Sequence, residues 1–152
     1  MRRKDRERDE EFAIGVIDSA PYGVAAFTDE NGDPYAIPLS LVRIGKELYF
    51  HSAKAGTKNE IFKTEPRACV TFADNVIPAT DAFTTGYDSA IVKGRLCEVT
   101  DDEEKVMALK KLSEHFCPGH MAKFGEAIEM SLGRTAVFKI SMEEITGKQK
   151  KL

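Results

Sequence analysis

The sequence has no tryptophan, only three cysteines and no long apolar run. Cys69, Cys97 and Cys117 are odd in number and widely spaced, without a C-x-x-C pair. This spacing does not suit a disulfide framework, so we expect free, buried thiols in a reducing compartment, the cytoplasm. A membrane-spanning helix needs about 20 consecutive apolar residues, and no segment approaches that length, so we expect no membrane partner.

The chain also lacks an excess of one charge. Its 22 basic and 25 acidic residues are interspersed and give a net charge of −3, which argues against a nucleic-acid partner, because such proteins concentrate basic residues on one face. The charged start has no apolar segment behind it and cannot be a signal peptide. At 152 residues, without repeats, we expect one domain over 1–152, with an N-terminal arm at 1–8 and a solvated C-terminal tail at 147–152.

Hydrophobic periodicity and turn residues predict an α+β fold with about six antiparallel strands. Helices are expected over 9–20, 57–64, 100–116 and near 121–128, and strands over 22–28, 35–44, 47–52, 67–73, 89–99 and 135–141. These elements do not alternate as βαβ units, which favours a curled antiparallel sheet, plausibly a barrel. Gly94 predicts a bulge or bend at a barrel corner, and 100–103 has the form of a capping box. The interval 74–88 has two turn clusters and no clear element.

A candidate anion site follows the third expected strand. The chain passes Gly56 and enters a helix with Thr57 and Lys58 in its first turn. Helix N-termini expose unpaired amides and favour phosphate; Ser52 and Thr57 would add hydroxyls, and Lys54 or Lys58 a positive charge. The same pattern also fits an ordinary strand-to-helix connection in which Thr57 caps the helix and the lysines are solvated. The G-x-x-x-x-G-K-[ST] order of a P-loop is absent.

Two further groups could carry chemistry. His51 could donate a proton to a reduced substrate, since a free imidazole titrates near pH ~6.5, or it could simply pack at a strand end. His115, Cys117 and His120 resemble a metal cluster, but they offer at most three ligands, and the Pro-Gly pair between them is typical of a helix stop. Zinc sites usually pair ligands at both ends of a loop, so we predict no metal site.

Six segments, taken in their order and spacing, resemble the nitroimidazole-resistance protein family, a branch of the pyridoxamine 5′-phosphate oxidase-like FMN-binding split barrels. They are RRKDR at 2–6, PYAIPLS at 34–40, LYFHSAKAGTK at 48–58, SAIVKGR at 89–95, RTAV at 134–137 and EITGK at 144–148. The resemblance covers nearly the whole chain. It implies an FMN-binding split β-barrel in which FMN lies across the middle strands, in a cleft shared by the two subunits of a homodimer.

The resemblance also implies a set of site residues. In it, 38–40 supply backbone groups to the isoalloxazine ring, His51 lies on the substrate side, and Lys58 pairs with the FMN phosphate. The cofactor-binding residues are then Ile37, Pro38, Leu39, Ser40, His51, Ser52, Thr57, Lys58, Ser89 and Lys148, with His51 as the catalytic candidate. Ser89 follows a stretch that is hard to align, and Lys148 would close over the cofactor.

The implied activity is an FMN-dependent reductase that passes electrons from NADH or NADPH to a small oxidised substrate, with nitroimidazole-type nitro compounds as candidates. A pyridoxamine 5′-phosphate oxidase-like enzyme is an alternative. The chain ends in KQKKL at 148–152 and lacks the arginine-rich C-terminal segment with which those oxidases hold the substrate phosphate. A non-catalytic flavin sensor or storage protein is a third interpretation.

Overall fold

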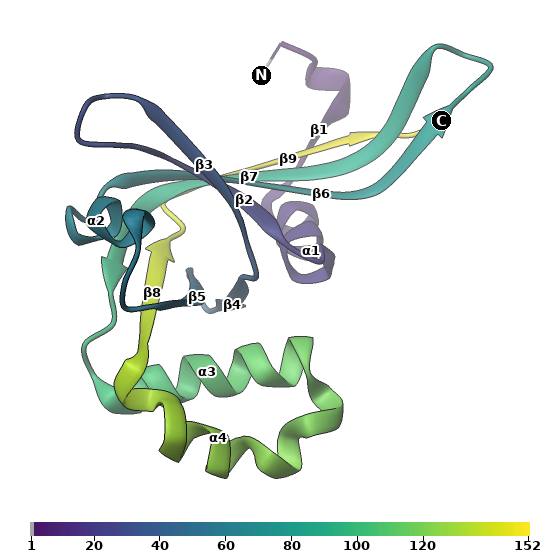
Figure 1. Cartoon of the computed structure of the whole chain (residues 1–152). Coiled ribbons are helices and arrows are strands. Elements are labelled where there is room, and N and C mark those ends of the chain that lie inside the picture. Colours follow the sequence, from purple (N-terminus) through teal and green to yellow (C-terminus); the bar gives the residue numbers. More distant parts are fainter. Residues whose placement is uncertain (1) are drawn as a thin grey trace.

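The computed structural model describes residues 2–152, except for the side chain of Thr57, and shows an antiparallel barrel flanked by helices (Figure 1). The helices are α1 (Glu10–Ser19), α2 (Thr57–Lys63), α3 (Asp102–Phe116) and α4 (Phe124–Ser131), with 3₁₀ turns η1 (Lys4–Arg6), η2 (Pro118–Lys123) and η3 (Leu132–Arg134). The strands are β1 (Glu7–Arg8), β2 (Gly23–Thr28), β3 (Pro34–Leu39), β4 (Val42–Ile44), β5 (Glu47–Ala53), β6 (Arg67–Ala79), β7 (Thr84–Glu98), β8 (Thr135–Ser141) and β9 (Glu144–Lys150).

The strands pair in the order β3-β2-β6-β7-β8-β5-β4, with β9 beside β7 and β1 beside β9. Every pairing is antiparallel, which confirms the α+β class, but the described residues form nine strands rather than about six. Among the described residues, no helix combines the length and the apolar composition that a bilayer crossing requires.

Strand β7 passes from one sheet to the other at Gly94. Up to Lys93 it pairs with β9, and from Leu96 it pairs with β8. A Cβ atom at Gly94 would lie 1.6 Å from the backbone oxygen of Ser141, so a side chain cannot be accommodated there. The irregularity predicted at Gly94 is therefore confirmed, and it marks the corner where the two sheets meet.

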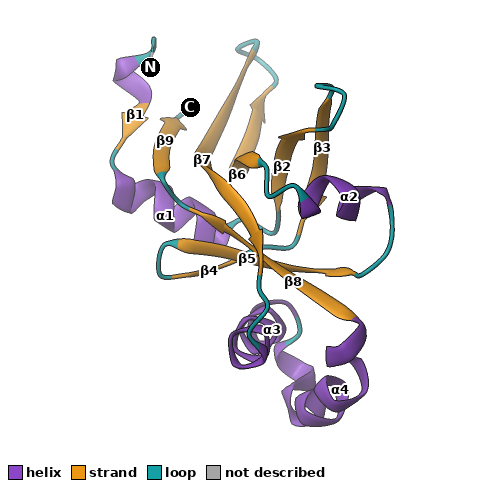
Figure 2. Ribbon diagram, turned by 90° about the vertical axis from the view of Figure 1, so that its left-hand side faces the viewer, coloured by secondary structure: helices purple, strands orange, loops and turns teal. Residues whose placement is uncertain are grey.

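The barrel encloses a first core with an aromatic centre. The rings of Phe27, Phe50 and Phe138 lie 5.0 to 5.5 Å from that of Phe62, which α2 carries into the barrel. Helix α1 buries one face against the same core, after Asp9 caps its start by accepting a hydrogen bond from the Phe12 amide at 2.9 Å. A second, smaller core lies outside the barrel, where α3 and α4 pack against β4, β5 and β8 (Figure 2).

The interval 74–88, for which no element was predicted, extends β6 and β7 into a long hairpin arm. Three local predictions were wrong. The strand expected over 35–44 divides into β3 and β4. The cap of α3 is Asp101, which accepts from the Glu104 amide at 2.8 Å, rather than Thr100. The expected tail at 147–152 is mostly strand: β9 runs to Lys150, and the N-terminal arm pairs with it as β1.

Candidate functional site

Strand β5 directs its two central polar side chains to opposite faces. Ser52 points into the barrel, where its residue is only 4% exposed, whereas His51 lies on the outer face and is exposed. This follows from the alternation of side chains along a strand. His51 can therefore contact a ligand outside the barrel, and Ser52 can contact a ligand that reaches the barrel interior.

The end of β5 and the first turn of α2 each hold a buried polar atom that needs a partner. Within the described part of the chain, Ser52 Oγ and Asn59 Oδ1 are buried without a hydrogen bond. Asn59 is fixed by its amide nitrogen, which donates to the Ala53 carbonyl at 2.8 Å. Because a buried unpaired polar group is unfavourable, these two atoms fit a site completed by a bound polar group. The anion site predicted here has this feature.

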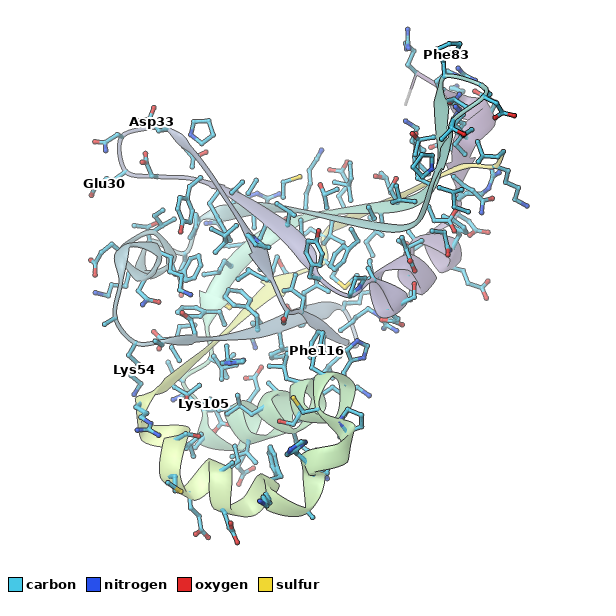
Figure 3. All side chains as sticks on the ribbon, turned by 45° about the vertical axis from the view of Figure 1, so that its right-hand side comes forward. Glu30, Asp33, Lys54, Phe83, Lys105 and Phe116 are labelled. Carbon is cyan, nitrogen blue, oxygen red and sulfur yellow. The ribbon has the colours of Figure 1, made fainter. Side chains whose placement is uncertain are left out.

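The cation available to that site is Lys58. Its side chain is half-buried, near enough to His51 for its charge to act on the ring. Lys54 instead donates to the Gly133 carbonyl at 2.5 Å and links the end of β5 to η3 (Figure 3). Gly56, with a φ of 123°, makes the turn into α2, a backbone conformation that favours glycine. The Thr57 side chain, also expected here, lies outside the described residues.

The electrostatics of His51 favour the neutral ring. The surrounding protein partly desolvates the imidazole although its surface is exposed, and this lowers the pKa of His51 below 6.5; the charge of Lys58 lowers it further. At neutral pH the ring therefore carries one N–H donor and one acceptor nitrogen rather than a positive charge.

His51 opens onto a cleft of about 440 Å³ between β5 and the α3–α4 pair. Apart from His51, the described residues that line this cleft are uncharged and mostly apolar. They are Ser40, Leu109, Leu112, Ser113, Phe116, Cys117, Phe124, Ala127, Ile128, Ser131 and Thr135. Cys117, expected to be buried, is exposed here. Sequence reasoning missed this cleft, although Phe124 and Ile128 at i, i+4 spacing indicated an apolar face on α4.

The predicted residues of β3 divide between the two faces of the sheet. Ile37 packs against the first core and Leu39 is buried, whereas Pro38 is exposed on the outer face. Ser40, just after β3, lines the same cleft as His51. The structure thus brings Ser40, His51, Ser52 and Lys58 to one region around the ends of β3 and β5.

Ser89 and Lys148 form a separate group on the outer face of the sheet. They pair across β7 and β9, and the Ser89 hydroxyl donates to the Lys148 carbonyl at 3.4 Å. Arg95 of β7 lies beside the end of α2, where it donates to the Glu65 carbonyl at 2.9 Å. Ser89 lies six residues away along β7, or about 20 Å at the usual strand rise of about 3.3 Å. One chain therefore keeps this pair apart from Lys58.

The group around Lys148 includes a residue that sequence reasoning missed. The Lys148 ammonium lies 5.4 Å from the centre of the Tyr87 ring. Hydrogen bonds from Lys148 and then Arg6 lower the pKa of the Tyr87 hydroxyl. The ring of His115 packs edge-on against that of Phe116. Among the described residues no cluster of three or more histidine, cysteine or acidic side chains could hold a metal ion.

The family model described as pyridoxamine 5′-phosphate oxidase matches residues 9–149. None of the curated proteins matches this chain. Many solved structures match this chain. The three named below are each less than 25% identical to it, so their similarity shows the fold alone.

Three solved structures illustrate the likeness. One, from Bacteroides thetaiotaomicron, is named for 5-nitroimidazole antibiotic resistance; it is 23% identical, with a TM-score of 0.76 over 93% of this chain and 84% of that one. An FAD- and haem-binding protein of Mycobacterium smegmatis is 21% identical, with a TM-score of 0.83 over 97% and 74%. A flavocytochrome of Azotobacter vinelandii is 23% identical, with a TM-score of 0.79 over 100% and 72%.

Proposed function

The chain belongs to the pyridoxamine 5′-phosphate oxidase family, and we propose that it is an FMN-dependent reductase that passes electrons from NADH or NADPH to a small oxidised substrate. The observation that carries this proposal is the buried Ser52 hydroxyl, which has no hydrogen-bond partner among the described residues. It lies near the end of β5, the strand that leads into the helix start bearing Lys58, and the neighbouring residue of that strand, His51, faces an apolar cleft. The similarity to the Bacteroides protein makes nitroimidazole-type nitro compounds the candidate substrates.

Each residue of the site would have a distinct task. Lys58 would neutralise the FMN phosphate, and Ser52 would donate to it, since charge-assisted hydrogen bonds are the stronger kind. The backbone around Pro38 and Ser40 would hold the ring system. FMN supplies the transfer of electrons between donor and substrate, and the protein supplies its orientation and electrostatic surroundings.

His51 would act on the substrate side. With a lowered pKa the ring is neutral at pH 7, so it would orient a substrate through its N–H and hold a proton at one nitrogen. Proton donation from the charged imidazolium would instead increase as the pH falls through the lowered pKa of His51. A pH–rate profile whose acidic limb disappears in His51→Gln would show this role.

We propose that two copies complete the site. Pro38, Val24, Thr71, Ile91 and Thr146 form a row of uncharged residues across the outer face of the sheet, with Val24 and Ile91 38% and 39% exposed. None of the helices α1–α4 lies over this face (Figure 1). A second copy docked there would cover the exposed row, and the Ser89–Lys148 pair of one copy would lie near the Lys58 region of the other.

Sedimentation would test the dimer. Ile91→Lys should convert it to monomer and weaken FMN binding together, because a lysine would be buried without a counter-charge. Met107→Lys is the matched control, since Met107 is 41% exposed on α3, away from the outer sheet face. A monomeric wild-type protein that binds FMN tightly would contradict this arrangement.

Flavin binding itself is tested by absorption and titration. Purified protein should be yellow, and Lys58→Met should weaken FMN binding by roughly 10- to 100-fold, which corresponds to about 1.5–3 kcal/mol for a charge-assisted bond. Lys63→Met is the control, because Lys63 lies on the same helix and pairs with Glu60 at 2.7 Å. A colourless protein that ignores added FMN would remove the proposal.

Two assays separate the alternatives. Hydrogen peroxide release with pyridoxamine 5′-phosphate would indicate oxidase activity, to which the family match alone points. Anaerobic mixing with NADH or NADPH should bleach the flavin of a reductase within seconds. A flavin that stays oxidised with both donors would favour a sensor or storage protein.

A further inference from the structure

We propose that the cleft between β5 and the α3–α4 pair is the substrate site, and that it selects small, uncharged aromatic molecules over phosphorylated ones. The inference that a ligand binds in this cleft is drawn from the cleft alone. The inference that the ligand is reduced there rests on the proposed reductase function.

The walls suit a flat apolar body. Leu109 and Leu112 of α3 are buried and form one side, continuous with the second core. Phe124 and Ile128 of α4 are only half-buried, and no residue of α4 is fully buried. The apolar face of α4 therefore keeps surface that the chain does not cover. A volume of about 440 Å³ lies within the usual range for small-molecule sites, about 300–1,000 Å³.

The polar groups of the cleft are few. Ser131 donates its hydroxyl to the Ala127 carbonyl at 2.6 Å, and Thr135 donates to the Ser131 carbonyl at 2.9 Å, so both serve the end of α4. Among the described lining residues this leaves Ser40, Ser113, His51 and the weakly polar thiol of Cys117 to meet a ligand. A neutral imidazole and hydroxyls can orient a nitro or carbonyl oxygen, but they cannot balance a full negative charge.

The charge of the cleft sets its selectivity. The described lining contains no lysine or arginine, and His51 is neutral at pH 7. The nearby cation Lys58, which acts on His51, is the one proposed to pair with the FMN phosphate. An anion that entered the cleft of the FMN-loaded protein would therefore lose water without gaining a counter-ion, which disfavours carboxylates and phosphates strongly. A neutral aromatic ring would gain burial against Phe116, Phe124 and Ile128 at no such cost.

The position of the cleft links it to the cofactor. Ser40 and His51 line the cleft, and both also belong to the stretches proposed to hold FMN. A molecule in the cleft would therefore lie on the substrate side of the ring, with His51 between them. Apart from Thr135 of β8, the remaining walls come from α3, Cys117 and α4, outside the barrel.

The test compares para-nitrobenzyl alcohol with para-nitrophenyl phosphate, two probes with the same ring and different charge. Their binding to the full-length protein with FMN is measured by titration calorimetry in the absence of reductant. The alcohol should bind at least about tenfold more tightly than the phosphate, because only the phosphate must be buried without a counter-ion. Equal affinities would overturn the proposal.

Ala127→Lys places a cation in the cleft, and Met130→Lys places one on the same helix at a residue that is 75% exposed and outside the lining. Ala127→Lys should raise phosphate affinity by about tenfold or more, as a counter-charge does for a partly buried anion, while Met130→Lys leaves it unchanged. Identical behaviour of the two variants would place the probe elsewhere and overturn the proposal.

The two proposals fail differently. If the alcohol binds with the expected selectivity but NADH and NADPH give no reduction of its nitro group, the reductase function is wrong and the cleft assignment stands. If the nitro group is reduced and Ala127→Lys changes neither binding nor rate, the cleft assignment is wrong and the reductase function stands.

Discussion

The interior of the barrel and the layer of α3 and α4 outside it are built from the same kinds of residues, but only the barrel interior is closely packed. Phe27, Phe50, Phe62 and Phe138 pack ring against ring inside the barrel, with Phe62 completely buried. Outside, Phe116, which Figure 3 labels, and Phe124 remain half-buried. They line a cleft of about 440 Å³. The difference indicates that the barrel provides stability, whereas the outer layer provides a binding surface.

The largest effect on stability should come from Phe62→Ala. Deleting a ring at the centre of a close-packed aromatic cluster removes burial and leaves a cavity, so the free energy of unfolding should fall by about 4 kcal/mol. Denaturant unfolding monitored by circular dichroism measures it. A loss below about 1 kcal/mol would mean that the barrel interior is as open as the outer layer.

Gly94→Ala tests the corner that closes the barrel. The added methyl group would overlap the Ser141 backbone oxygen, so β7 and β8 must move apart, at a cost of about 3 kcal/mol. Gly15→Ala is the control, because a Cβ atom there has no neighbour within 4 Å; it should be neutral or stabilising by up to about 1 kcal/mol. Thermal unfolding of both variants compares them directly.

The contact that joins the two regions should depend on pH. Glu104 of α3 accepts from Tyr49 of β5 at 2.8 Å and from Lys139 of β8 at 2.7 Å. The hydrogen bond from Lys139, followed by that from Tyr49, lowers the pKa of Glu104 below 4.5, and the bond to Glu104 raises the pKa of Lys139 above 10.5. The pair therefore stabilises the fold fully between those values. Its contribution is lost as pH falls through the lowered pKa of Glu104 or rises through the raised pKa of Lys139.

Glu104→Gln isolates this charge effect. At pH 7 it should lower the free energy of unfolding by about 1 kcal/mol, since both side chains are roughly a quarter exposed. The curves of variant and wild type should converge as the pH falls well below 4.5, which unfolding measured from pH 3 to 8 would reveal. A constant difference across that range would contradict the role of the carboxylate charge.

The smallest effect on stability should come from Phe124→Ala. The ring is half-buried at an open cleft, so its removal should cost less than about 1 kcal/mol while weakening the binding of para-nitrobenzyl alcohol severalfold. Unfolding and calorimetric titration on the same preparation separate the two effects. Equal losses in both would mean that Phe124 supports the fold rather than the ligand.

Sequence patterns predicted those elements whose signals are local. Helix α1 was predicted because apolar side chains recur at helical spacing and Pro21 follows them, and the corner at Gly94 because glycine interrupts a strand pattern. Strand β9 was missed because its seven residues have a single large apolar side chain, Ile145, among charged and polar ones. The segment is a strand because it pairs with β7 and β1, and hydrophobic periodicity does not predict such pairing between distant segments.

The candidate site was predictable in its members but not in its arrangement. The strand-to-helix pattern indicated Ser52 and Lys58, and the family resemblance added His51, Ser89 and Lys148. The separation of the last two from Lys58 depends on how far β7 extends, and the opposite faces of His51 and Ser52 depend on which side of β5 the barrel closes. Both are properties of long-range strand pairing.

Strand β7 belongs to both sheets, and this has a consequence for amide hydrogen exchange. Its residues from Ser89 to Lys93 lie between β6 and β9, and its end from Leu96 lies beside β8, so neither sheet can separate from the other while β7 stays paired. Amide protons along this stretch should exchange with solvent only when the whole barrel opens, whereas those at the arm tip near Phe83 should exchange rapidly (Figure 3). The barrel then opens as one cooperative unit, because β7 is paired in both of its sheets.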